Sequence, residues 1–120
     1  MNKLTALNTL KAALLATSLL ALPAAQAVTM SKVDYKAGKT RIGADYKTDK
    51  AGCASLAANA KDICMQEAKA KEKVALAELE FAYSGKATDR NKVQVAKAES
   101  AYAVAKERCD DMSGNTKDVC

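Results

Sequence analysis

Two copies of one cysteine-containing unit constrain this chain more than any other feature of its sequence. One copy spans 46–64, from Tyr46 to Cys64, and the other spans 102–120, 56 residues later. Each places ten residues between two cysteines and ends in Asn-x-Lys-Asp, a branched aliphatic residue and Cys. The fold must therefore satisfy the same local geometry twice.

The first 27 residues read as a secretory signal peptide that is cleaved after export. Lys3 gives a positive amino end, an apolar run follows over 12–22, and Pro23 ends it ahead of Ala25-Gln26-Ala27. The run is too short to cross a bilayer comfortably, and the small-x-small triplet is typical of a signal peptidase site. We expect a mature chain 28–120 in the periplasm, without stable membrane insertion after cleavage.

All four cysteines lie in the mature chain, and an even count in an oxidising compartment predicts disulfides. Four cysteines allow three pairings. We favour the local pairing, because each unit carries its own helix stop, cap and cysteine pair; it joins Cys53 to Cys64 and Cys109 to Cys120. The nested pairing stays open; it joins Cys64 to Cys109 and Cys53 to Cys120 across a helical hairpin.

The mature chain predicts an all-α fold, with antiparallel helical hairpins in a three-helix, coiled-coil-like arrangement held by two disulfides. It contains no proline, and 62–83 consists mostly of the strong helix formers Ala, Glu, Lys, Leu and Gln. We expect helices near 31–57, 60–83 and 88–112, with a last turn that ends at Cys120. The organisation is one Ala-rich helical domain over 28–120 that contains both units.

Local signals place the ends and the packing face of these helices. Ser31 is expected to cap the first helix, Asn59 and Asn115 to cap the helices of the two corners, and Gly85 to end the second helix. A 3-4 spacing on the third helix indicates a coiled-coil seam against the second helix. The seam consists of Val95, Ala98, Tyr102, Ala105, Cys109 and Met112. The Ala-lined strip that is expected to face it consists of Cys64, Ala68, Ala75, Leu79 and Ala82.

The predicted core is thin, because alanine supplies much of the apolar surface and a methyl group buries little area. Each local disulfide would contribute about 2–3 kcal/mol on the chain-entropy model. Gly38, Gly43 and Gly52 are expected to weaken the first helix by roughly 1 kcal/mol each relative to Ala.

The residue types present predict no catalytic residue, no metal site and no cofactor, and therefore a protein that is not an enzyme. The chain has no histidine, which removes the commonest general base and most catalytic zinc sites. A ten-residue cysteine spacing fits neither zinc knuckles nor thiol-exchange motifs. Cleavage of the signal peptide removes Lys3 and Lys11, so the mature chain has 17 of the 19 basic residues and 14 acidic ones, a net charge of +3. This charge is dispersed along the chain, so we expect no nucleic-acid partner.

The signal, the Ala/Lys/Glu helices and the Asn-x-Lys-Asp-aliphatic-Cys elements resemble a group of small, uncharacterised periplasmic helical proteins of Gram-negative bacteria. These have Cys-x10-Cys repeats and are sometimes labelled TolA-like cell envelope biogenesis proteins. The resemblance implies location and helical build, and no activity. Such units continue into a further helix, so the unit that stops at Cys120 is expected to be truncated. A looser resemblance, to the twin Cys-x9-Cys hairpin proteins of mitochondria, implies the nested pairing; longer helices and the bacterial-type signal depart from it.

We expect a non-enzymatic structural or interaction protein of the cell envelope, whose helix faces pack on an unknown envelope protein or on a second copy of the chain. The alternative is a stress-type periplasmic chaperone or scavenger that binds unfolded chains or anionic envelope polymers through Lys-rich faces. A redox or metal sensor built on the four cysteines is disfavoured by their spacing.

Overall fold

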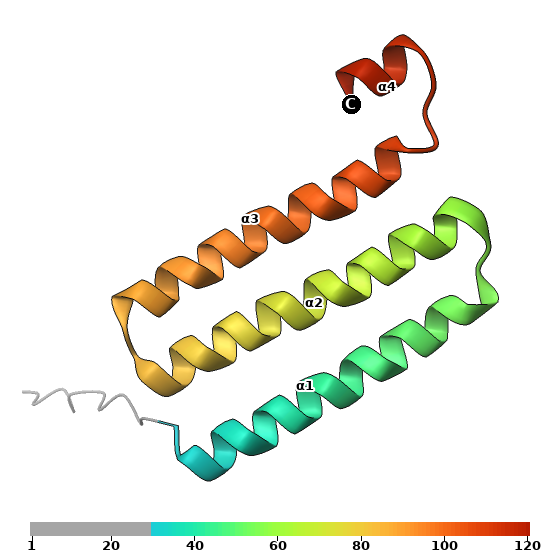
Figure 1. The fold of residues 1–120 in the computed structure, drawn as a ribbon. Helices are drawn as coiled ribbons and strands as arrows, with labels where there is room; N and C mark the ends of the chain where they lie inside the picture. Colours follow the sequence, from blue (N-terminus) through green and yellow to red (C-terminus); the bar gives the residue numbers. More distant parts are fainter. Residues whose placement is uncertain (1–29) are drawn as a thin grey trace, which may run out of the picture.

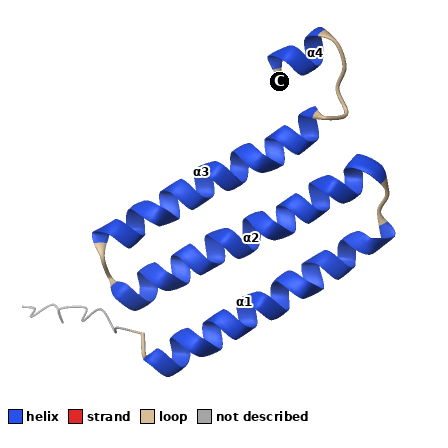
Figure 2. Ribbon diagram, in the orientation of Figure 1, coloured by secondary structure: helices blue, strands red, loops and turns tan. Residues whose placement is uncertain are grey.

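A computed structural model of the protein describes residues 30–120, so the expected signal peptide 1–27 and the start of the mature chain at Val28 lie outside the described residues. Within 30–120 the chain is all-α (Figure 2), as predicted. The elements are α1 (Lys32–Gly52), a short 3-10 helix (Cys53–Ser55), α2 (Ala58–Ser84), α3 (Ala87–Cys109) and α4 (Asn115–Val119).

The three long helices lie side by side in one layer, with α2 in the middle (Figure 1). α1 packs against α2 and α2 packs against α3, whereas α1 and α3 are not packed against each other. A layer that is one helix thick has two open faces and can bury little. The buried apolar residues of the described chain are Cys53, Ala68, Val93 and Ala96.

Two of the predicted helix ends are confirmed. Ser31 caps α1, because its Oγ accepts a hydrogen bond from the backbone N–H of Asp34 at 3.0 Å. Gly85 ends α2 in the left-handed conformation, with φ of 64°, and its N–H donates to the Phe81 carbonyl at 2.8 Å. Glycine takes this conformation without the steric cost that a Cβ imposes.

The expected N-caps at Asn59 and Asn115 are wrong. Each follows a residue with a positive φ, Ala58 with φ of 48° and Gly114 with φ of 55°, and both asparagines already lie inside their helices. The side-chain amide of Asn59 instead donates to the carbonyl of Glu107 at 3.0 Å. This bond ties the start of α2 to the last turn of α3.

Both units end their first α-helix at or next to the first cysteine, earlier than predicted. α1 gives way to the 3-10 helix at Cys53 instead of running to residue 57, and α3 ends at Cys109 instead of Met112. In each case the disulfide joins the helix end to the returning chain, so the break coincides with the corner.

The predicted seam of α3 is also wrong, because α3 turns its other side toward α2. The buried residues of α3 are Asp89, Val93, Ala96 and Ser100. The predicted seam is not the buried face: Val95 is 52% exposed, Tyr102 is 72% exposed, and Ala105 is an exposed residue at the edge of the contact with α2. A 3-4 spacing identifies an apolar stripe on a helix, and it does not say which helix covers that stripe.

Candidate functional site

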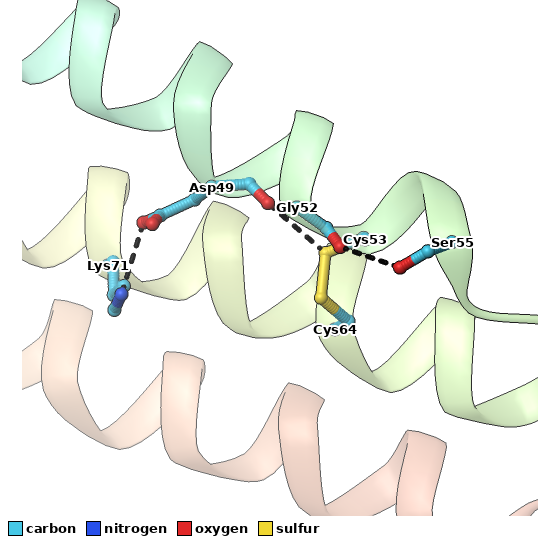
Figure 3. The surroundings of a disulfide bond; sticks show 6 residues. All are labelled: Asp49, Gly52, Cys53, Ser55, Cys64 and Lys71. Atoms are coloured by element: carbon cyan, nitrogen blue, oxygen red, sulfur yellow. Dashed lines mark hydrogen bonds and ion pairs between the residues drawn. A yellow bond between two sulfur atoms is a disulfide. The ribbon is translucent and has the colours of Figure 1, made fainter.

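The first disulfide clamps the corner between α1 and α2 from the inside (Figure 3). Cys53 is fully buried, and the Cα atoms of Cys53 and Cys64 are 5.7 Å apart. The Sγ of Cys53 lies 3.3 Å from the carbonyl oxygen of Asp49, one turn back along α1. The bridge therefore fixes the end of α1 on the second turn of α2.

The second disulfide has the same spacing in a different setting. Its Cα atoms, in Cys109 and Cys120, are 5.9 Å apart, and residues 110–120 are exposed throughout. It holds α4 to the end of α3. The structure thus has the local pairing, and none of the described cysteines is a free thiol.

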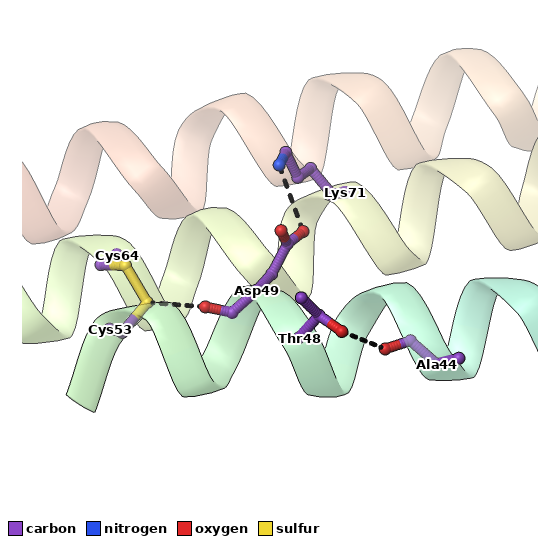
Figure 4. A network of polar contacts seen from close by, with 6 residues as sticks. All are labelled: Ala44, Thr48, Asp49, Cys53, Cys64 and Lys71. Carbon is purple, nitrogen blue, oxygen red and sulfur yellow. Dashed lines mark hydrogen bonds and ion pairs between the residues drawn. A yellow bond between two sulfur atoms is a disulfide. The ribbon is translucent and has the colours of Figure 1, made fainter.

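Asp49 connects the first clamp to the polar contacts between helices (Figure 4). Its carboxylate accepts from the Nζ of Lys71 on α2 at 3.1 Å, while its carbonyl faces the bridge. Other ion pairs cross from α2 to α3, and they join Glu67 to Arg108, Glu78 to Lys97 and Lys73 to Glu99. Their side chains are largely exposed, so each contributes roughly 0.2–1 kcal/mol. They act mainly by fixing the register of the helices.

Near the start of α1, Tyr35 and Gly38 determine how closely α1 packs against α2. The rings of Tyr35 and Tyr83 stack with centroids 4.5 Å apart, and the Tyr35 hydroxyl donates to Glu80 at 2.5 Å. This hydrogen bond, with a smaller contribution from burial, raises the pKa of Tyr35 above its ordinary value. A Cβ on Gly38 would lie 2.7 Å from Cδ1 of Leu79, so this glycine permits close packing.

Asp89 organises the turn between α2 and α3. Its buried carboxylate accepts from the Nζ of Lys92 at 2.8 Å and from the Oγ of Ser84 at 2.6 Å. These hydrogen bonds, that of Lys92 foremost, hold the pKa of Asp89 below its ordinary value. The same pairing raises the pKa of Lys92. These partners account for the buried charge as a structural feature of the turn.

An apolar groove of about 700 Å³ runs between α2 and α3 on one face of the layer. Its small apolar side chains are those of Ala70, Val74, Ala75, Ala101, Val104 and Ala105. Lys71 and Ala75 also border a hollow of about 370 Å³ between α1 and α2, so the two openings adjoin on the same face.

Ser100 borders this groove and has a buried hydroxyl that is unsatisfied. The residue is 6% exposed, and its Oγ has no hydrogen-bond partner among residues 30–120. A buried hydroxyl without a partner costs about 1–3 kcal/mol. Because this oxygen is itself buried, the groove offers a bound segment apolar contact.

No protein-family model matches the chain, and no curated protein or solved structure matches it either. Over residues 30–120 no three potential metal ligands of the His, Cys, Asp or Glu type come together. The helices of that same part of the chain include none that is long and apolar enough to span a bilayer.

Sequence reasoning located the cysteine corners and missed the groove. Ala75 of the predicted strip and Ala105 of the predicted seam line it, but its larger side chains, Val74 and Val104, belong to neither set. Their apolar character was visible in the sequence. Which helix faces meet depends on three-dimensional packing, so the positions could not be assembled into a site from spacing alone.

Proposed function

We propose that this chain is a non-enzymatic structural and interaction protein of the bacterial cell envelope, exported to the periplasm by its amino-terminal signal. The observation that carries the proposal is the open apolar groove between α2 and α3, in a layer of helices only one helix thick. An exposed groove lined by small apolar side chains is a surface onto which a partner helix or extended segment can pack.

The two disulfides support the location. Disulfides persist in oxidising compartments and are rare in the bacterial cytoplasm, so both bridges fit a protein outside the cytoplasm. The charged amino end, the apolar run 12–22 and the Ala25-Gln26-Ala27 site agree with export. The disulfides and the signal together favour a periplasmic location over a cytoplasmic one.

The test is photocrosslinking in intact cells, with the crosslinking side chain placed in the groove. Ala101 lines the groove and is exposed, and Ala44 on α1 is an exposed helical alanine outside the groove and serves as the matched control. We expect a discrete adduct from Ala101 in the periplasmic fraction that is absent from Ala44. Equal labelling at both positions, or a reduced protein in the cytoplasm, would contradict the proposal.

A second candidate function is a chaperone or scavenger for unfolded chains, and the mixed lining of the groove favours it, since Lys71, Glu78 and Arg108 border its apolar side chains. An apolar groove bordered by charged side chains suits an extended segment that has apolar side chains and unpaired backbone groups. This function predicts that the protein suppresses the aggregation of a reduced, unfolding client, and that Val104→Asp removes the suppression. Ala44→Asp is the control, and unchanged aggregation with the wild-type protein would exclude this function.

A further inference from the structure

The two disulfides have the same sequence separation, but they differ in exposure. In the first corner Cys53 is fully buried and Cys64 is half-buried. In the second corner Cys109 is half-buried and Cys120 is exposed. Because both bridges belong to one molecule and close loops of one size, a difference in their reactivity toward thiols would come from their surroundings.

The neighbours of the second bridge do not shield it. Residues 110–119 are all exposed, and Val119, next to the second cysteine, is 76% exposed. Its counterpart in the first unit, Ile63, is half-buried. The hydrogen bond from Asn59 to the Glu107 carbonyl also holds the first corner against α3. A thiol in solution therefore has access to the second bridge, whereas the fold covers the first.

Opening the second bridge leaves the packed helices in place. α4 lies at the end of α3 and does not pack along any of the long helices (Figure 1). An exposed ion pair at 3.4 Å, between Lys117 and Asp110, also joins α4 to the chain before it, and such a pair contributes little. Exchange at the second bridge thus requires no unfolding of the layer, whereas a thiol reaches Cys53 only after the first corner has opened.

We propose that the second corner is a site of reversible thiol modification, at which a low-molecular-weight thiol forms a mixed disulfide with Cys120. A small thiol is the class that fits, because access is the property that distinguishes this bridge. The Cys-x10-Cys spacing lacks the activation of catalytic Cys-x-x-Cys motifs, so the corner is a target of exchange and not a catalyst. The inference goes beyond the proposed function, since it does not involve the groove.

The exchange balances without an external oxidant. The thiolate attacks the Sγ of Cys120, the exposed member of the pair, and forms a new S–S bond while the bond to Cys109 breaks. The electron pair leaves on the Sγ of Cys109, which takes a proton from water. The product has a mixed disulfide on Cys120, a free thiol on Cys109 and a released α4. In the reverse step the Cys109 thiolate attacks the mixed disulfide and expels the small thiol.

The test is incubation of the oxidised, exported protein with reduced glutathione, followed by alkylation and peptide mapping of each cysteine. We expect the second bridge to open roughly tenfold or more faster than the first, with glutathione bound to Cys120. The first bridge is the control within the same molecules, and far-UV circular dichroism should show that α1, α2 and α3 stay folded. Equal rates for the two bridges, or faster opening of the first, would overturn the proposal.

Two single variants test which sulfur is modified, and both keep the buried bridge. Cys109→Ser leaves the thiol of Cys120, and Cys120→Ser leaves that of Cys109. With oxidised glutathione we expect the Cys120 thiol to form its mixed disulfide severalfold faster than the Cys109 thiol. Equal rates would contradict the assignment of Cys120.

The reverse step is tested by removing free glutathione. The wild-type adduct should then be lost as the bridge closes again, whereas the adduct of Cys109→Ser should persist, because no neighbouring thiol can expel glutathione. A wild-type adduct that persists equally would overturn the reversible modification. All of these measurements use purified protein and none depends on Ala101, so their failure is distinct from a failure of the groove crosslinking.

Discussion

Removing the buried disulfide should cost this protein much of its stability. The perturbation is the double variant Cys53→Ala with Cys64→Ala. The bridged residues are 11 apart in sequence, and for a loop of that size the chain-entropy relation gives about 3 kcal/mol. Small domains have total stabilities of about 5–15 kcal/mol, and the core of this one is thin, so a loss of this size matters.

The second disulfide provides the matched control. Cys109 and Cys120 are also 11 residues apart, so the entropic term of their loop is the same. Their bridge holds only the five-residue α4 and exposed residues around it. Removal of both cysteines should therefore release α4 by local unfolding and change the global unfolding free energy by less than about 0.5 kcal/mol.

Urea unfolding followed by far-UV circular dichroism measures both effects, and hydrogen exchange locates them. We expect the first double variant to lose about 3 kcal/mol and to lose amide protection in α1. The second should lose protection only in α4. If the two variants were equally stable, or if the first matched the wild type, the idea that a buried clamp compensates for a thin core would be wrong.

Three further predictions follow from the backbone and the turn. Gly43→Ala should stabilise the protein by about 0.5–1 kcal/mol in urea unfolding, because its Cβ would meet nothing within 4 Å; Gly38→Ala should gain less or destabilise, since its Cβ would lie 2.7 Å from Leu79. The left-handed conformation of Ala58 costs about 1 kcal/mol, and glycine does not have this cost, so Ala58→Gly should raise the thermal midpoint. An unchanged midpoint would argue against the positive φ at residue 58. The stability advantage of the wild type over Asp89→Asn should be full above the ordinary aspartate pKa of about 4 and should disappear as the pH falls through the lowered pKa of the folded protein; an advantage that persists there would exclude the Asp89 hydrogen bonds as its source.

Local features of the chain could be predicted because they depend on neighbours in sequence. The all-α fold follows from helix propensity and the absence of proline in 30–120, and Ser31 and Gly85 mark helix ends by hydrogen bonds that they make within a few residues. The Cys53–Cys64 pair is of the same kind, since the corner brings both cysteines together locally. In these cases interactions within a short segment determine the conformation of that segment.

Tertiary packing decided which side of α3 is buried. The helix has two apolar stripes, one with Val93 and Ala96 and the other with Val95 and Tyr102, and periodicity marks the second more strongly. α2 covers the first, and interhelical contacts such as the one between Asn59 and Glu107 accompany that choice. The groove and the unpaired Ser100 follow from the same choice. Sequence spacing specifies a stripe along one helix, but burial is a property of two surfaces, and the second surface is placed only when the chain folds.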